Sequence, residues 1–398
     1  MFCKITKEKI KPFMSFGRMP IANGFISKKK MKREFSFEME VGFSKKLSLF
    51  QLNDHPAPKQ MFNQNYPFFT SSSQYMVKHF EVFSKWIKKN YLKKINRVIE
   101  IGSNDGSFLK NFKSKNTKIL GIEPSKNVAS IANRKKIKTI NKFFSYETSN
   151  QIKNFKGKTD LIVAANAICH IPDLKDLIKG VDNLLTKKGL FIFEEPYLGS
   201  MYEKTSYDQI YDEHIYMFSA TSIKKIFNLF NFELIDILPQ KTHGGSMRYI
   251  VGRQNTHKIK KSVFNQLNYE KKNFIDKMKG CLLFKKKCEK SKKELRKKID
   301  KILKSGKKIA GYAATSKSTT ILNYCGINNN HIDFICDTTL DKIGKYTPLS
   351  HIPIVDMDHY RKNVPDYTFL FAWNHKKEIF KKEKKLLNKT KWIAHINI

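Results

Sequence analysis

The residues best suited to proton transfer stand together in the segment from Tyr211 to Tyr216, which reads Tyr-Asp-Glu-His-Ile-Tyr. The unperturbed pKa of histidine, about 6.5, allows His214 to take a proton near neutral pH. Asp212 and Glu213 could orient its ring, and the two tyrosines could polarise a substrate oxygen. A single histidine on a loop is more often structural, so the role of His214 depends on the elements that hold this segment.

A glycine turn between a strand and a helix start is predicted over residues 98–110. Apolar β-forming residues lead to Glu100, and then Gly102 and Gly106 let the chain turn sharply against a ligand. The order Glu-x-Gly-x-x-x-Gly differs from the Gly-x-Gly-x-x-Gly that places a pyrophosphate over a helix N-terminus. An acidic strand end suits the sulfonium cation of S-adenosylmethionine (SAM). We therefore expect this turn, with Asn104 and Asp105, to bind SAM.

A second acidic strand end follows at Glu123 and Pro124, after the apolar residues 119–122. A carboxylate about twenty residues beyond such a turn is where a ribose diol is held. Taken alone, Glu123 could merely cap the following helix. Because both strand ends carry a carboxylate, we expect Glu123 to bind the ribose of SAM.

Strands and helices alternate from about residue 95 to 200, as a doubly wound sheet requires. Residues 160–166 and 189–194 are predicted to be its fourth and fifth strands. Ligands in such sheets lie beyond the carboxyl ends of the strands. This rule adds Asn166, Ala167 and His170 to the expected cofactor contacts and places His214 after the fifth strand, where an acceptor would enter.

Two further segments could reach the same site. Tyr66 lies on an aromatic loop before a helix predicted from apolar spacing at Met76 and Phe80, and Ser71 to Ser73 read as its N-cap. Residues 242–248 interrupt a strand with two glycines. This interruption is either a bulge or a backbone shelf that carries His243 into the site.

A second α/β unit begins at residue 308 and turns through Thr-Ser-Lys-Ser-Thr-Thr (315–320) into a helix. Hydroxyls and a lysine at a helix N-terminus form a ready anion site, although ordinary capping would use the same residues. Without Gly-Lys-Ser/Thr the segment is no P-loop. We expect Ser316, Lys317 and Ser318 to hold a substrate diphosphate, with Asn374 after a later strand and Tyr216 also facing the substrate.

Composition narrows the function classes. The 398 residues are long enough for two or three domains, and no apolar run reaches the roughly 20 residues that span a bilayer. Scattered cysteines and the lack of a signal peptide favour a cytoplasmic protein without membrane association. The net charge of +41 is mostly lysine, and no RNA-binding signature appears, so no specific nucleic-acid partner is expected.

Together these motifs resemble the SAM-dependent C-methyltransferases that act on nucleotide-linked keto-deoxysugars. The similar segments are residues 19–23 (Met-Pro-Ile-Ala-Asn), 66–72, 100–106, 211–216, 242–246 and 311–320. The resemblance implies a small zinc module (1–60), a class I Rossmann-like SAM methyltransferase domain (61–255), a helical connector (256–304) and a C-terminal Rossmann-like substrate domain (305–398). It also implies that His214 is the base and that Tyr211, Glu213 and Tyr66 line the sugar site.

One departure from that family concerns its zinc, which two Cys-x-x-Cys pairs hold. Only Cys3 is retained here, because Thr6, Ser44 and Leu47 stand at the other three positions. One thiolate cannot complete a tetrahedral site, so we expect no metal.

The sequence thus predicts an α/β enzyme, expected to be a monomer, that methylates carbon. His214 would deprotonate a carbon next to a sugar ketone, Tyr211 and His243 would stabilise the enolate oxygen, and Glu213 would position the imidazole or a sugar hydroxyl. An O- or N-methyltransferase of another small molecule would share the cofactor site, and an RNA methyltransferase or RNA-binding protein is the remaining alternative.

Overall fold

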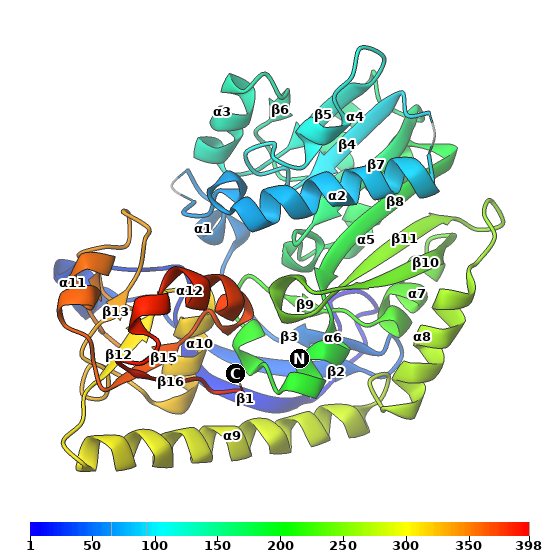
Figure 1. Cartoon of the computed structure of the whole chain (residues 1–398). Helices are drawn as coiled ribbons and strands as arrows, with labels where there is room; N and C mark the ends of the chain where they lie inside the picture. Colours follow the sequence, from blue (N-terminus) through cyan, green and yellow to red (C-terminus); the bar gives the residue numbers. More distant parts are fainter. Residues whose placement is uncertain (65, 93, 398) are drawn as a thin grey trace.

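A computed structural model describes residues 1–64, 66–92 and 94–397 of the chain. The strands of these residues form three sheets, and a long helix runs beneath two of them (Figure 1). The helices are α1 (Pro58–Met61), α2 (Gln74–Asn90), α3 (Lys126–Arg134), α4 (Tyr146–Gln151), α5 (Leu174–Leu184), α6 (Leu198–Lys204), α7 (Ala220–Asn228), α8 (Lys261–Lys272), α9 (Met278–Lys304), α10 (Ser316–Cys325), α11 (Met357–Lys362) and α12 (Lys376–Lys382).

The central sheet has seven strands in the order β10-β11-β8-β7-β4-β5-β6. Its members are β4 (Arg97–Ile101), β5 (Lys118–Ile122), β6 (Thr139–Ile140), β7 (Thr159–Ala165), β8 (Leu185–Pro196), β10 (Phe232–Gln240) and β11 (Ser246–Arg253). The neighbours from β6 to β8 pair in parallel, whereas β11 pairs antiparallel with both β8 and β10. The predicted α/β class is confirmed.

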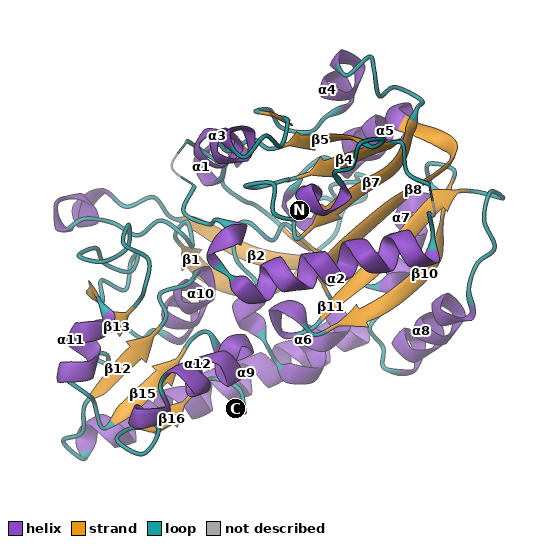
Figure 2. Cartoon of the chain, turned by 45° about the horizontal axis from the view of Figure 1, so that its top comes forward, coloured by secondary structure: helices purple, strands orange, loops and turns teal. Residues whose placement is uncertain are grey.

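Helices cover both faces of this sheet, as Figure 2 shows. Successive residues of β4 and β7 face opposite sides, so Val98 packs with α2 in one hydrophobic cluster while Ile99 packs with α5 and α7 in another. This two-sided burial explains why the strands read as unbroken apolar runs.

The predicted helix start after the glycine turn is only a 3-10 turn, η3 (Leu109–Phe112). Phe108 stacks on Phe80 and Phe83 of α2, with ring centroids 4.7 and 4.8 Å apart. Helix α2 therefore covers the part of the sheet next to this turn.

The N-terminal sheet contains β1 (Pro12–Met19), β2 (Phe37–Ser44), β3 (Leu49–Leu52) and β9 (Tyr216–Met217), all antiparallel. Strand β9 comes from the segment that directly follows His214. The next residue, Phe218, accepts a hydrogen bond at 2.9 Å from the backbone N–H of Leu198, which follows β8. The segment with His214 is thus fixed between the N-terminal and central sheets.

The C-terminal sheet is parallel in the order β14-β13-β12-β15-β16. Its strands are β12 (Ile309–Tyr312), β13 (Ile335–Cys336), β14 (Ile354–Val355), β15 (Tyr367–Leu370) and β16 (Lys391–Ile393). All pairs within it are parallel, as in a Rossmann-like unit.

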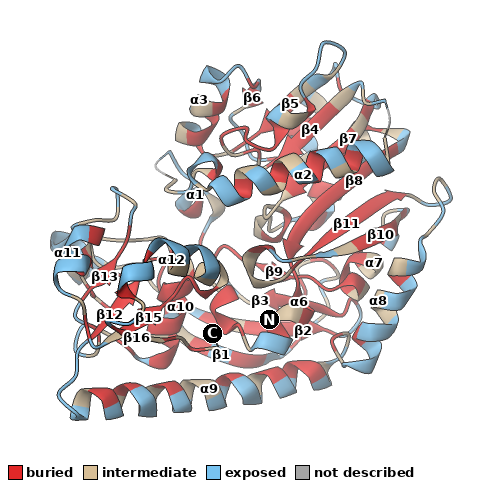
Figure 3. Ribbon diagram, in the orientation of Figure 1, coloured by how far each residue is buried: buried red, intermediate tan, exposed pale blue. Residues whose placement is uncertain are grey.

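The connector is a helix pair, α8 and α9, and one long face of α9 is exposed in Figure 3. The lysine clusters of residues 257–304 predict a solvated face opposite the apolar residues Phe264, Leu282 and Leu283, but these three side chains are 54%, 47% and 46% exposed. The buried positions of α9 are instead Cys281, Phe284, Cys288, Leu295, Ile299 and Ile302, which recur at helical spacing. Among the described residues, no helix is both long enough and apolar enough to cross a bilayer.

Candidate active site

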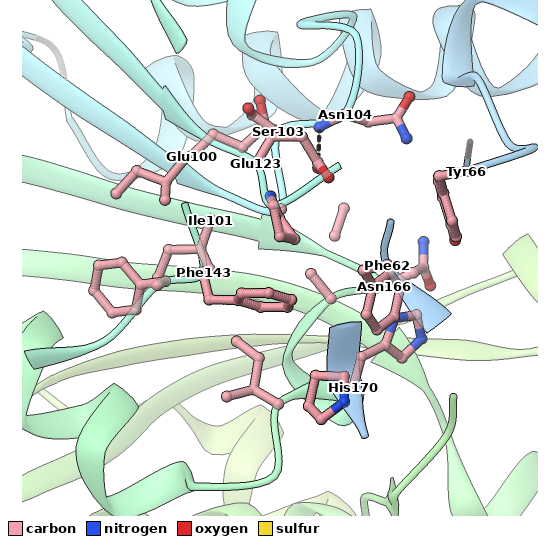
Figure 4. A pocket seen from close by; sticks show the side chains of 18 of the residues that line it. Phe62, Tyr66, Glu100, Ile101, Ser103, Asn104, Glu123, Phe143, Asn166 and His170 are labelled. Carbon is pink, nitrogen blue, oxygen red and sulfur yellow. Dashed lines mark hydrogen bonds between the residues drawn. The ribbon is translucent and has the colours of Figure 1, made fainter. Parts of the chain in front are cut away.

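A cavity of about 580 Å³ lies at the carboxyl ends of β4, β5 and β7 (Figure 4). The predicted residues that line it are Tyr66, Glu100, Gly102, Asn104, Glu123, Pro124, Asn166, Ala167, His170 and His243. Because β4, β5 and β7 run parallel, their carboxyl ends all lie at this edge of the sheet. The structure therefore brings most of the predicted cofactor residues together.

Both acidic strand ends are buried in the cavity wall. Burial raises the pKa of Glu100 and of Glu123. Oε2 of Glu123 accepts the backbone N–H of Asn104 at 2.9 Å (dashed in Figure 4), and Oε1 accepts that of Ser125 at 2.8 Å, so the capping role is present as well. Oε2 of Glu100 is buried without a hydrogen-bond partner. A cationic ligand in the cavity would favour the ionised form of this carboxylate.

The glycine turn requires its special backbone conformation. Gly102 has a φ of +68°, and a Cβ added to it would lie 2.6 Å from the Cβ of Ala167. Asn104 also has a positive φ, +49°. Its side chain accepts the N–H of Thr70 at 2.9 Å and donates to the carbonyl of Phe68 at 3.1 Å, so the turn anchors the aromatic loop that covers the cavity.

Asp105 and Gly106, predicted as cofactor contacts, lie outside the cavity lining. The Asp105 carboxylate accepts the N–H of Ser71 at 3.0 Å and the hydroxyl of Ser107 at 2.7 Å. A Cβ on Gly106 would press on Ile137, 3.0 Å away. These two residues therefore stabilise the turn and do not line the cavity. The serine cluster contributes its N-cap through Ser73 alone, whose Oγ accepts the N–H of Met76.

Three rings form a stack that runs from the cavity wall to His214. Phe62 stacks on His170 and His170 stacks on His214, with centroids 5.5 and 5.2 Å apart. His170 lines the cavity, and its Nε2 is buried without a partner. His214 lies one ring behind this wall and is 5% exposed.

The ring of His214 is oriented by two hydrogen bonds. Nδ1 lies 2.7 Å from the carbonyl of Gln209, and because a carbonyl only accepts, Nδ1 carries the hydrogen. Nε2 therefore accepts from the hydroxyl of Tyr211, 2.8 Å away. Burial, together with neighbouring His170, lowers the pKa of His214 well below its usual value, and burial lowers that of His170 to about 4. Burial therefore favours the neutral form of both imidazoles.

The ring nitrogens of His214 bond Tyr211 and Gln209, so of the two roles predicted for Glu213 the positioning of the imidazole is wrong, and the positioning of a sugar hydroxyl stays a prediction. Oε1 of Glu213 accepts from Nδ2 of Asn23 at 2.6 Å, and its Oε2 accepts from the hydroxyl of Tyr66 at 3.4 Å. The backbone of Gln209 orients the ring in its place. Burial raises the pKa of Glu213 and of the adjacent Asp212.

His243 reaches the cavity from the η6 turn (Thr242–Gly244) between β10 and β11, as the shelf interpretation expects. Its Nε2 is buried without a partner, and burial, with nearby Lys317, lowers its pKa to about 3. Nζ of Lys317 donates to Oδ1 of Asn374 at 3.2 Å, and Ser316 at the same helix end lies close to the hydroxyl of Tyr211. The N-terminus of α10 therefore lies beside Tyr211, the hydrogen-bond partner of His214.

Two residues that were predicted to contact the substrate make hydrogen bonds within the protein instead. Tyr216 is buried in β9, and its hydroxyl donates to the carbonyl of Pro172 at 2.5 Å. Ser318 is fully buried in a capping box with Thr315, where its Oγ donates to the Thr315 carbonyl at 2.6 Å. Neither side chain faces the cavity.

Three residues of the site were missed by sequence reasoning. Gln209 acts through its backbone carbonyl, which no side-chain pattern reveals. Phe62 belongs to the aromatic stretch before Tyr66 but carried no assigned role. Asn23 lies in the Met-Pro-Ile-Ala-Asn motif, and its distance of 190 residues from Glu213 hid the contact.

Cys169, His170 and His214 bring possible metal-ligand atoms within 4.8 Å of one another. The two imidazoles stack with an interplanar angle of 25°, so their lone pairs do not converge. Both nitrogens of His214 are already hydrogen-bonded. The cluster therefore does not present the converging ligand atoms that tetrahedral coordination requires.

Three family models match consecutive parts of the chain. Residues 2–62 match "Putative zinc binding domain", residues 75–237 match "Methyltransferase domain" and residues 241–396 match "C-methyltransferase C-terminal domain". C-methyltransferase NovU of Streptomyces niveus is 29% identical over 377 residues, which cover 94% of this chain and 90% of NovU.

Two solved structures are similar to part of the chain. The PH0226 protein of Pyrococcus horikoshii OT3 is 15% identical with a TM-score of 0.38, over 47% of this chain and 95% of that one. Magnesium protoporphyrin IX methyltransferase (ChlM) of Synechocystis PCC 6803 is 14% identical with a TM-score of 0.34, over 45% of this chain and 79% of that one.

The zinc that the first model implies does not fit the residues present. Two turns with zinc-knuckle character remain, because the N–H of Thr6 donates to Sγ of Cys3 at 3.4 Å and that of Leu47 donates to Oγ of Ser44 at 3.2 Å. However, Cys3 supplies the single thiol, and Leu47 is 2% exposed in the same hydrophobic cluster. This donor set lacks the ligands that zinc requires.

Proposed function

Because this chain belongs to the SAM-dependent C-methyltransferases, with a class I methyltransferase domain at its centre, we propose that it methylates a carbon of a nucleotide-linked keto-deoxysugar. The observation that carries this proposal is the contact between the Tyr211–His214 pair and the stacked wall of the SAM cavity. Carbon methylation needs a base of this kind, because a C–H proton must leave before carbon can attack.

The cavity residues fit SAM, which supplies an electrophilic methyl group on sulfur when bound. Glu123 would hold the ribose hydroxyls, since each of its oxygens keeps a free lone pair beside the backbone N–H it accepts. The unpartnered oxygen of Glu100 favours the positive charge of the cofactor. Gly102 lets the ligand approach the backbone closely.

Tyr211 and His214 act as one base in this proposal. The Tyr211 oxygen takes the proton from the carbon beside the ketone while its own proton moves to Nε2 of His214. Neutral His214 can accept this proton because its lone pair faces the hydroxyl. The unpaired Nε2 atoms of His170 and His243 would donate hydrogen bonds to the oxygen that becomes negative.

The substrate diphosphate is proposed to lie at the N-terminus of α10. Lys317 and Ser316 supply a positive charge and a hydroxyl beside Tyr211, and the helix dipole favours an anion there. In this proposal the Glu213 carboxylate accepts a hydrogen bond from a sugar hydroxyl. Its hydrogen bonds from Asn23 and Tyr66 leave lone pairs free for this contact.

The proposal is tested by incubating the protein with SAM and a panel of keto-sugar nucleotides and detecting methylated product by mass spectrometry. His214→Ala and His214→Asn should abolish turnover, because they remove the terminal proton acceptor, while SAM still binds with the affinity of the unmodified protein by calorimetry. His257→Ala is the matched control, since that ring does not line the cavity and its Nε2 lies 3.1 Å from the carbonyl oxygen of Lys188. Normal turnover in the His214 variants would contradict the assigned base.

Methylation at carbon is separated from methylation at oxygen or nitrogen by solvent exchange. With substrate in D₂O and no SAM, the Tyr211–His214 base should place deuterium on the carbon beside the ketone. A methylated product without such exchange would favour an O- or N-methyltransferase.

A further inference from the structure

The loop of residues 20–24 joins the N-terminal sheet to the active site. It leaves β1 and closes a turn in which the N–H of Gly24 donates to the carbonyl of Ile21 at 2.9 Å. Asn23 then extends to Glu213, where its Nδ2 lies 2.6 Å from Oε1. The two residues are separated by most of the central domain in sequence, so only the docked N-terminal sheet brings them together.

Ala22 fixes this loop from two sides. Its backbone N–H donates to Oδ1 of Asp212 at 2.9 Å, and its carbonyl accepts the hydroxyl of Thr319 in α10 at 2.8 Å. Ala22 is 2% exposed and Thr319 is 1% exposed. Parts of all three domains therefore determine where the Asn23 side chain lies, and it has little freedom to move away.

Glu213 depends on Asn23 for its geometry. Of the two side-chain hydrogen bonds that the structure gives its carboxylate, the one from Asn23 is short and the one from Tyr66 is long, at 3.4 Å. An amide N–H stabilises a buried carboxylate in its ionised form and fixes its plane. Without Asn23, the carboxylate could rotate or take up a proton.

We infer that Asn23 is a positioning residue of the active site, which holds the Glu213 carboxylate toward the sugar, and that the N-terminal module is part of the catalytic machinery. This inference rests on the proposed function, in which Glu213 accepts a sugar hydroxyl. Asn23 acts through Glu213 and need not touch the substrate itself.

Asn23→Ala tests the inference. We expect the turnover number to fall at least tenfold, while the affinity for SAM and the melting temperature stay close to those of the unmodified protein. Asn23→Asp should lose more activity than Asn23→Ala, because a second carboxylate would repel Glu213. Asn53→Ala is the matched control, since Asn53 makes a similar bond to Glu40 at 3.3 Å in the same module, away from the cavity. Unchanged turnover in Asn23→Ala, or an equal loss in SAM affinity, would overturn the inference.

A second measurement needs no substrate and so remains informative if the proposed function fails. Infrared absorption of protonated carboxyl groups is followed through a pH titration, with Glu213→Gln identifying the Glu213 band. Loss of Asn23 should move this titration to higher pH by removing a donor to the ionised form. Other titratable groups that interact with Glu213 are present in both the unmodified protein and Asn23→Ala, so they do not account for a difference between the two titrations. These groups are Tyr66, Cys169, Tyr211 and Asp212. An unmoved band in Asn23→Ala would contradict the positioning role even in an enzyme with another substrate.

Discussion

Glu123 holds the glycine turn through Asn104, and in the proposed function the same carboxylate would also bind the ribose of SAM. Glu123→Gln replaces one of its oxygens by an NH₂ group, which can no longer accept from Asn104 or Ser125. Hydrogen bonds to charged groups contribute about 1.5–3 kcal/mol. We therefore expect the affinity for SAM, measured by calorimetry, to fall at least tenfold.

Asp160→Asn is the control for this change. Asp160 also accepts two backbone N–H groups, from Asn96 and Arg97 at 2.7 and 3.1 Å, but it stands at the start of β7, away from the cavity. Its loss should lower stability and leave the SAM affinity unchanged. Equal affinities for Glu123→Gln and the unmodified protein would remove Glu123 from the cofactor site.

Sequence reasoning correctly located the residues that stand at strand ends, while their roles stay predictions. Glu100, Glu123 and Asn166 lie where parallel strands must end together, and all three line the cavity. It failed where a side chain had a nearer partner, as Asp105 has in Ser71 and Tyr216 has in Pro172. Such partners come from packing between distant segments, which spacing does not encode.

The turn after β4 is the element on which the cavity shape depends. Gly102→Ala forces a side chain into the left-handed region, which costs about 1–2 kcal/mol. The added Cβ would also lie 2.6 Å from Ala167, on the neighbouring strand end. Because the turn must then move into the cavity, we expect both a lower melting temperature and a loss of SAM affinity of at least tenfold.

Gly157→Ala separates these two effects. Gly157 has a similar φ of +62°, but nothing lies within 4 Å of its added Cβ. This variant should show the backbone cost alone, with a lower melting temperature and unchanged SAM affinity. If Gly102→Ala behaves in the same way, the close approach to Ala167 has no effect on the cavity.

The secondary structure elements with long apolar runs were predicted well. The prediction was poor for helices in which apolar residues occur on more than one side. The strands of the central sheet carry long apolar runs, and their positions are confirmed within a few residues. In α9, the apolar residues Leu282 and Leu283 stand between Cys281 and Phe284 in the sequence, but only Cys281 and Phe284 are buried. The choice between them depends on which side of the helix meets the body of the molecule.

At the scale of the whole molecule, the N-terminal module is stabilised by its contacts with the central domain. Its sheet receives β9 from the segment after His214, and residues 22 and 23 bond the carboxylates of Asp212 and Glu213. The sequence could not show that the module shares a sheet with the central domain, because β9 spans only Tyr216–Met217. This shared sheet gives the module a source of stability that does not require a metal.

The last prediction concerns that metal. The residues after both knuckle turns, Lys7 and Ser48, retain positive φ values of 60° and 51°, so the backbone still resembles a zinc site although its ligands are lost. The purified protein should contain no stoichiometric zinc by mass spectrometry of metals, and chelators should leave its melting temperature unchanged. Replacing the three missing ligands in one variant (Thr6→Cys, Ser44→Cys and Leu47→Cys) should create a site that binds one zinc ion and makes stability sensitive to chelators. Stoichiometric zinc in the unmodified protein, with stability lost on chelation, would show that other donors complete the site around Cys3.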